Sequence, residues 1–168
     1  MSDLFSPRII SQAEISDCGE YRYSLVRRWS EEKLLTFVML NPSTADHTKD
    51  DPTIRRCLGF ARREKAGGIR VVNLFGFRAT DPRELENASY PRGDGNAAAL
   101  FVAVKAADRA PIICAWGSHR VAVDEGRSFV EWARDDLSAT LMCLGKTKEG
   151  HPRHPLYVRG DQPFEDYP

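Results

Sequence analysis

The sequence predicts one α/β domain, a three-layer α/β/α arrangement around a mostly parallel, four-stranded central sheet. Its 168 residues are 42% hydrophobic and 29% charged, as is typical of one globular domain. Short apolar runs alternate along the chain with segments of helical periodicity. No repeat, low-complexity tract or Pro/Gly/Ser-rich linker interrupts them, so we expect a single domain over residues 1–168.

The first half of the chain contains two predicted strands and one predicted helix. Residues 21–29 (YRYSLVRRW) alternate roughly between apolar and polar, which predicts a half-exposed extra strand. Residues 34–40 (LLTFVML) are almost wholly apolar, as in a strand that is covered on both faces. Asp51 and Pro52 suit the N-cap and first position of a helix, and the glycines at 67–68 predict its end.

The second half continues the alternation of strands and helices. The predicted elements are strands at 69–74, 111–116 (PIICAW) and 140–144 (TLMCL), with helices at about 96–107 and 121–135. This order implies a mostly parallel sheet with helices on both faces. Ligands of such sheets bind beyond the carboxyl ends of the strands, so we expect the functional site there.

Composition excludes several functional classes. Lys plus Arg and Asp plus Glu both number 24, so the net charge is zero, which argues against a bulk polyanion binder but allows a local basic groove. No apolar run is long enough to span a bilayer. Residues 1–8 lack the basic flank and apolar core of a signal peptide. We therefore expect a soluble, cytoplasmic protein with no membrane partner.

The cysteines and histidines do not show metal-ligand spacing. The cysteines form no C-x-x-C pair, which favours buried free thiols in a reducing compartment over a zinc or iron–sulfur site. The histidines have neither i,i+4 spacing nor an acidic pair. These residues are Cys18, Cys57, Cys114 and Cys143, and His47, His119, His151 and His154. We expect no metal and no cofactor.

Polar side chains follow each of the four predicted core strands. The segments that follow them are 41–47 (NPSTADH), 73–82 (NLFGFRATDP), 116–119 (WGSH) and 145–157. Because the carboxyl ends of parallel strands meet at one edge of the sheet, these segments predict a hydrogen-bonding pocket there. Turn chemistry alone explains part of the pattern, since Asn-Pro and Gly-Ser end many strands.

The last of these loops is basic. Four basic residues and one acidic residue give residues 145–159 a net charge of +3. Such a loop at the ligand edge suits a phosphate or sugar-phosphate backbone, with Lys146, Lys148 and Arg153 as the predicted phosphate-binding residues. The alternative is a solvated basic turn. Residues 145–147 (GKT) copy the end of a phosphate-binding P-loop, but the required earlier glycine is Thr140.

Four stretches in order resemble a bacterial family of small uncharacterised proteins that is defined only as a domain of unknown function. They are FVMLNPSTADHTKDDPTIRRC, VVNLFGFRATDP, CAWGS and LGKTKEGHPRHPLY. The resemblance covers about residues 20–158 and implies no established activity.

The same stretches resemble, more distantly, the uracil-DNA glycosylase superfamily, whose members have a four-stranded parallel sheet between helices. There the first strand ends in an Asp-Pro or Asn-Pro segment that positions water, and Asn41 has this place. A His-Pro-Ser loop after the fourth strand contacts the base, and His154 has its histidine's place, with Leu156 for the serine. Residues 151–153 (HPR) are a competing match. The resemblance implies catalytic roles for Asn41 and His154.

Five further residues are expected to contact a base or other ligand. Asn73 follows the second core strand, where the superfamily carries an asparagine, and its amide suits a base edge. Trp116 stands where the third strand of the superfamily often ends in Trp-Gly, and Ser43 belongs to the first strand-end segment. Phe75 and Phe77 could stack on a base face, although such residues more often pack in a core or a lid.

We expect a nucleic-acid- or nucleobase-directed protein, with N-glycosidic bond hydrolysis as the reaction that the glycosylase resemblance implies. Its partner would be DNA or a nucleotide, bound through the strand-end loops. A second hypothesis is a non-catalytic module that binds a nucleotide or a modified base. A third is an enzyme that acts on a small phosphorylated metabolite. Fold alone does not decide between them.

Overall fold

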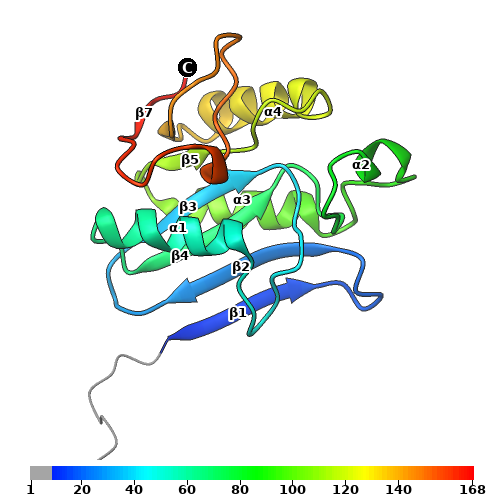
Figure 1. Ribbon diagram of the computed structural model, residues 1–168, viewed down its shortest axis with the longest axis horizontal. Helices are drawn as coiled ribbons and strands as arrows, with labels where there is room; N and C mark the ends of the chain where they lie inside the picture. Colours follow the sequence, from blue (N-terminus) through cyan, green and yellow to red (C-terminus); the bar gives the residue numbers. More distant parts are fainter. Residues whose placement is uncertain (1–8) are drawn as a thin grey trace, which may run out of the picture.

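The computed structural model describes residues 9–168, so the expectation about a signal peptide concerns residues outside the described part (Figure 1). The strands are β1 (Ile10–Ile15), β2 (Arg22–Arg28), β3 (Leu34–Met39), β4 (Gly68–Asn73), β5 (Ile112–Cys114), β6 (Leu141–Cys143) and β7 (Glu165–Asp166). The helices are α1 (Pro52–Arg63), α2 (Glu84–Asn87), α3 (Asn96–Ala107) and α4 (Ala122–Glu131), with a π-helical turn (Trp132–Asp136) and a 3-10 turn (Pro155–Tyr157). No helix in the described part is long and apolar enough to cross a membrane.

All the strands form one sheet in the order β1-β2-β4-β3-β5-β6-β7. The four core strands that the sequence predicts lie side by side and pair in parallel, as β4-β3-β5-β6. The remaining pairs, β1–β2, β2–β4 and β6–β7, are antiparallel. The α/β class is therefore confirmed, but the expectation of a four-stranded, mostly parallel sheet is wrong, because the sheet has seven strands and half its pairings are antiparallel.

The two unpredicted strands lie at the edges of the sheet. β1 is largely exposed, and β7 has two exposed residues. An edge strand buries little apolar surface, so its sequence shows little hydrophobic pattern. The extra strand predicted at 21–29 is present as β2, between β1 and β4.

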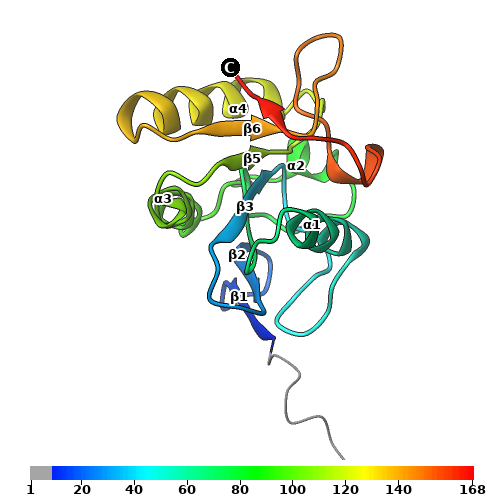
Figure 2. The same ribbon diagram turned by 90° about the vertical axis from the view of Figure 1, so that its left-hand side faces the viewer.

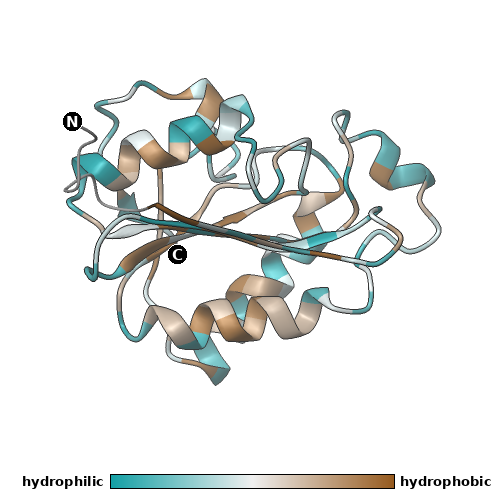
Figure 3. Cartoon of the chain, turned by 90° about the horizontal axis from the view of Figure 1, so that it is seen from below, coloured by the Kyte–Doolittle hydropathy of each residue, from teal (hydrophilic) through white to brown (hydrophobic). Residues whose placement is uncertain are grey.

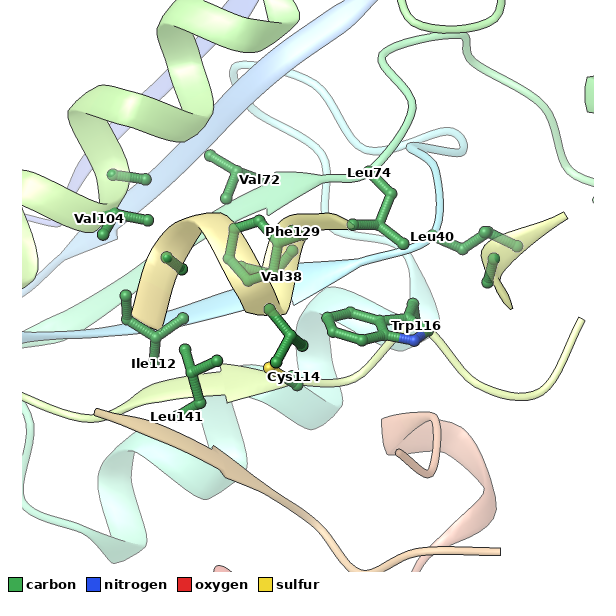
Figure 4. Close-up of a cluster of buried hydrophobic side chains, with 14 of the residues drawn as sticks. Val38, Leu40, Val72, Leu74, Val104, Ile112, Cys114, Trp116, Phe129 and Leu141 are labelled. Carbon is green, nitrogen blue, oxygen red and sulfur yellow. The ribbon is translucent and has the colours of Figure 1, made fainter. Parts of the chain in front are cut away.

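Helices cover both faces of the sheet, with α1 on one side and α3 and α4 on the other (Figures 2 and 3). Alternate residues of β3 face opposite sides. Phe37 packs in the cluster that includes Phe60 of α1, whereas Val38 packs in the cluster that includes Phe129 of α4 (Figure 4). Both faces of β3 are buried, as its nearly continuous apolar run predicts.

Helix α1 begins as the sequence predicts but ends earlier. Asp51 is its N-cap, with Oδ1 accepting a hydrogen bond from the Ile54 amide at 2.9 Å, and Pro52 occupies the first turn. The helix ends at Arg63, and Lys65 adopts a left-handed conformation. The predicted glycine stop is therefore wrong: the carbonyl of Gly67 accepts from the amides at 29 and 30 where β4 starts.

Three of the four cysteines are buried free thiols, as predicted. They are Cys57, Cys114 and Cys143, whereas Cys18 is exposed. Burial raises the pKa of the Cys57 thiol above its ordinary value, which disfavours its reactive thiolate form.

Two glycine-to-alanine substitutions should have opposite effects on stability. A Cβ at Gly67 would lie 2.2 Å from the main-chain oxygen of Glu32, so Gly67→Ala should lower the free energy of unfolding by about 2 kcal/mol or more. Gly59 lies inside α1 with nothing within 4 Å of a built Cβ, so Gly59→Ala should raise it by about 0.5–1 kcal/mol. Urea unfolding measures both changes. Equal effects would contradict the backbone contact at Gly67.

Candidate functional site

A cleft of about 1100 Å³ lies at the carboxyl ends of the parallel strands, where the strand order predicts a site. Segments following β3, β4, β5 and β6 line it together with the start of α1. The lining residues are Arg22, 39–41, 43–44, 51–54, 79–80, 82, 116–120, 147, 153–154 and 156–157. The cleft thus combines residues from nearly the whole length of the chain.

Half of the predicted site residues line this cleft. Asn41 and Ser43 reach it from the end of β3, Trp116 from the end of β5, and Arg153 and His154 from the loop after β6. The two predicted catalytic residues, Asn41 and His154, therefore share one cleft. Trp116 is largely buried and packs edge-on against Phe129, with 5.9 Å between the two ring centroids (Figure 4).

Three residues predicted to contact a ligand lie outside the cleft lining. Asn73 is fully buried, and neither atom of its side-chain amide makes a hydrogen bond within residues 9–168. Phe75 belongs to the core on the α3 and α4 side of the sheet. Phe77 packs against that core and lies edge-on to Tyr21, with which it forms an isolated β-bridge. This bridge holds Phe77 beside the start of β2, and the chain after β4 reaches the cleft only from Ala79 onward.

Two of the three predicted phosphate-binding residues also lie outside the cleft lining. Lys146 forms an ion pair with Glu165 at 3.4 Å and donates to the Asp166 carbonyl. Lys148 is exposed in the turn that precedes Gly150. Because β7 pairs with β6, its Glu165 reaches Lys146, and of the three only Arg153 lines the cleft.

Arg22 is a cleft residue that the sequence analysis missed. Glu14 pairs with Ser24 but Ile15 pairs with Arg22, so Tyr23 is an extra residue that forms a β-bulge in β2. Arg22 Nη1 donates to the carbonyl of Ala45 at 2.8 Å, on the α1 side of the sheet. The only sequence signal for this position was an arginine within a half-apolar strand. The bulge itself leaves no pattern in the sequence, so the direction of the side chain could not be predicted.

The guanidinium of Arg22 is buried and incompletely paired. Its side chain is 1% exposed, and its Nε has no hydrogen-bond partner among the described residues. Burial lowers the pKa of Arg22 to about 10, a shift that the nearby Asp51 carboxylate opposes. Arg22 therefore remains positively charged at pH 7, with an N–H donor lacking an acceptor beside the cleft.

Asp51 was predicted as a helix cap and also proves to be a cleft residue. Besides the Ile54 amide on Oδ1, its Oδ2 accepts a hydrogen bond from the Ala45 amide at 3.3 Å. The residue is 8% exposed and lines the cleft. Its negative charge acts on the titration of both Arg22 and His154, which places these three residues near one another; we call them the inner cluster.

His154 is a neutral hydrogen-bond donor in this cluster. Burial lowers the pKa of its imidazole from 6.5 to about 4, against the opposing effect of Asp51. Its Nδ1 accepts a hydrogen bond from the Leu156 amide at 3.3 Å. A neutral ring that accepts at Nδ1 carries its proton on Nε2, so Nε2–H is available to a ligand.

Asn41 connects two walls of the cleft. Its Nδ2 donates to the carbonyl of Ala79 at 2.8 Å and to that of Pro42 at 3.0 Å, and the Ala79 amide donates back to Pro42. These contacts occupy the amide nitrogen of Asn41. Its Oδ1 accepts no hydrogen bond from residues 9–168 and can accept one from a ligand or a water molecule.

The 3-10 turn after His154 forms an exposed rim that is fastened to α1. Tyr157 is 80% exposed and Leu156 is 40% exposed. Arg56 of α1 donates to the carbonyls of Pro155 and Val158. Arginine side chains of α1 therefore hold the chain that carries His154 against the helix whose first turn carries Asp51.

The described residues contain no group of three or more His, Cys, Asp or Glu side chains that could hold a metal ion. The inner cluster instead offers a guanidinium, a carboxylate and an imidazole. Such groups bind polar ligands by hydrogen bonds and can move protons.

The depressed pKa of His154 predicts a pH dependence of stability. Between about pH 6.5 and about pH 4 the unfolded chain binds a proton at this histidine that the folded chain does not. The free energy of unfolding should therefore fall as the pH decreases through this window. Denaturant unfolding at about pH 7 and about pH 4.5 should show a larger loss for the wild type than for His154→Gln. Equal losses would contradict the burial of the neutral ring.

Arg56→Met should loosen the rim. Loss of both carbonyl contacts should accelerate amide hydrogen exchange in residues 156–158 by about tenfold or more, because hydrogen bonds to a charged donor are among the stronger ones. Arg62→Met is the matched control, since the Arg62 guanidinium lies 5.0 Å from the Trp29 ring centroid and does not hold the rim. If both variants exchange alike, Arg56 does not anchor this turn.

Comparison with known proteins gives one match. The sequence profile of a family described as "Protein of unknown function (DUF1643)" matches residues 22–156, which include β2 to β6 and every residue lining the cleft except Tyr157. No curated protein and no solved structure matches the chain.

Proposed function

We propose, for a chain that belongs to the DUF1643 family, that the cleft receives the base of a DNA nucleotide and that the protein hydrolyses its N-glycosidic bond. Four adjacent parallel strands between helices support the resemblance to uracil-DNA glycosylases, as does the common cleft of Asn41 and His154. The fold by itself implies no reaction, so the argument depends on the cleft.

The observation that carries the proposal is the inner cluster, in which the buried, positively charged Arg22 lines the cleft together with Asp51 and His154. Arg22 Nη1 donates to Ala45, but Nη2 makes no hydrogen bond with residues 9–168, so it can donate to an acceptor atom of a ligand. The charges of Arg22 and Asp51 balance, and His154 is neutral. This set favours an uncharged ring with both donors and acceptors, such as a nucleobase, over a bare phosphate group.

The rest of the cleft suits a nucleotide. Trp116 supplies an apolar surface, while Ser43, Thr53 and Ser118 supply hydroxyl groups. A volume of about 1100 Å³ exceeds what a base alone needs, which leaves room for its sugar and flanking phosphates. Arg153 at the cleft is the candidate for a phosphate contact.

The reaction needs a donor for the departing base and a water molecule at the sugar. Breaking the bond between C1′ and the base nitrogen leaves the electron pair on the base, where the Nε2–H of His154 would stabilise the negative charge. Asn41 Oδ1 would accept a hydrogen bond from the water molecule whose oxygen bonds to C1′. A proton released by this water balances the one the base finally takes up.

The exposed rim supports an oligonucleotide substrate over a free base. A target base must leave its stack to enter a cleft, and the protein then needs a surface for the neighbouring bases. Leu156 and Tyr157 present exposed apolar and aromatic surface beside the cleft, which suits stacking on unpaired bases. Asn73, Phe75, Phe77, Lys146 and Lys148 take no part in this proposal.

Base release from labelled single- and double-stranded oligonucleotides tests the proposal. The panel carries uracil, hypoxanthine, xanthine and alkylated bases, with enzyme in excess at low salt. We expect release of at least one base, reduced about 100-fold or more in Asn41→Ala and His154→Ala, because each removes a group at the reacting centre. Lys148→Ala is the matched control and should leave the rate near wild type, since this side chain lies outside the cleft lining.

Absence of release for every base would contradict hydrolysis. Binding of the same oligonucleotides without release would then favour the non-catalytic module. Tighter binding of free nucleotides than of oligonucleotides, with little dependence on salt, would favour the enzyme of a small phosphorylated metabolite.

A further inference from the structure

The proposed hydrolysis leaves one chemical role unfilled. A water molecule that attacks C1′ must give up a proton, and the neutral amide of Asn41 is a poor acceptor for it. His154 lines the cleft, and with Nδ1 accepting from the Leu156 amide its Nε2 carries the proton, so its free nitrogen is a donor. The arrangement therefore needs a proton acceptor, and neither Asn41 nor His154, the two residues that the glycosylase resemblance indicates, can serve as one.

Asp51 has the one carboxylate among the described residues that line the cleft. Each of its oxygens accepts a single main-chain hydrogen bond, from Ile54 on Oδ1 and from Ala45 on Oδ2. A carboxylate oxygen has two lone pairs, so each oxygen keeps one for a further partner. The two amides also fix the orientation of the carboxylate, which a positioned proton acceptor requires.

Positive charge lies near Asp51, but none of it forms a direct ion pair with the carboxylate among the described residues. The N-terminus of the 12-residue helix α1 places positive partial charge beside it. Arg22 is near enough to interact with its charge but forms no ion pair with it. No ion pair with a described residue therefore keeps a water molecule from the carboxylate on the cleft side.

We propose that Asp51 is the catalytic base of this reaction. It would take a proton from the water molecule that Asn41 Oδ1 holds while the water oxygen bonds to C1′. The C1′–N bond breaks at the same time, and its electron pair goes to the nucleobase. The nucleobase departs as an anion that His154 stabilises, and protonated Asp51 then gives its proton to solvent or to the nucleobase. This inference rests on the proposed function, and it assigns proton transfer to the first turn of α1 and not to the strand end.

A purely structural role of Asp51 is the competing explanation, because the residue caps α1 and anchors Ala45. The test therefore needs variants that keep the cap. Asparagine and serine are both good N-cap residues, so Asp51→Asn and Asp51→Ser retain an oxygen for the Ile54 amide and remove the carboxylate. Asp46→Asn is the matched control, since Asp46 accepts from the Thr48 and Lys49 amides in the same loop but does not line the cleft.

Single-turnover base release and oligonucleotide binding are measured on all four proteins, together with Tm. We expect both Asp51 variants to release the nucleobase about 100-fold to 10,000-fold more slowly, with Kd for the oligonucleotide and Tm close to wild type, because a general base acts in the transition state. Asp46→Asn should release it at a rate within about threefold of wild type.

The outcomes separate the two proposals. A wild type that releases no base overturns the proposed function, and the role of Asp51 with it. A wild type that releases base while both Asp51 variants stay within about threefold of its rate overturns this inference alone. Variants that lose binding and rate together, in proportion to a lower Tm, also overturn it, because that result identifies Asp51 as structural.

Discussion

Arginine side chains that donate to main-chain carbonyl groups hold the segment between β3 and α1, and the cleft depends on them. Arg22 donates to Ala45, Arg27 to Asp46 and Lys49, and Arg78 to Ser43. Residues 40–51 contain no helix or strand, so their carbonyl groups have no regular partners. Without these donors the segment could not keep Asn41, Ser43 and Asp51 in place along one wall.

The same interaction recurs on the opposite wall. Arg56 and Arg63 of α1 donate to carbonyl groups between Pro155 and Gln162, so irregular chain again depends on arginine for its hydrogen bonds. The five N–H groups of a guanidinium allow one side chain to satisfy several carbonyls at once. The basic residues of α1, which in a sequence read as a solvated surface, thus position His154 relative to Asp51.

Burial of Arg22 and Arg27 connects stability to the chemistry of the cleft. Arg27 is 3% exposed and is paired with Asp50 at 2.9 Å, so its charge is compensated within the protein. Arg22 is as deeply buried but has no ion pair, and its Nε has no acceptor. Two arginines of one strand therefore differ: Arg27 fastens the loop through an ion pair, whereas Arg22 lines the cleft without one.

Hydrophobic periodicity in the sequence was sufficient to predict the four core strands, the extra strand β2, helices α1, α3 and α4, and the Asp51 cap. These features depend on local patterning and on burial of one face, which neighbouring residues specify. The strand order then located the cleft, and Asn41, Ser43, Trp116, Arg153 and His154 do line it.

Tertiary structure alone decided the rest. Pairing of β7 with β6 brought Glu165 to Lys146, the Tyr21–Phe77 bridge kept Phe77 outside the cleft lining, and a bulge in β2 placed Arg22 at the cleft. Each of these depends on a contact between residues far apart in the chain, and a pattern among neighbouring residues carries no record of such a contact.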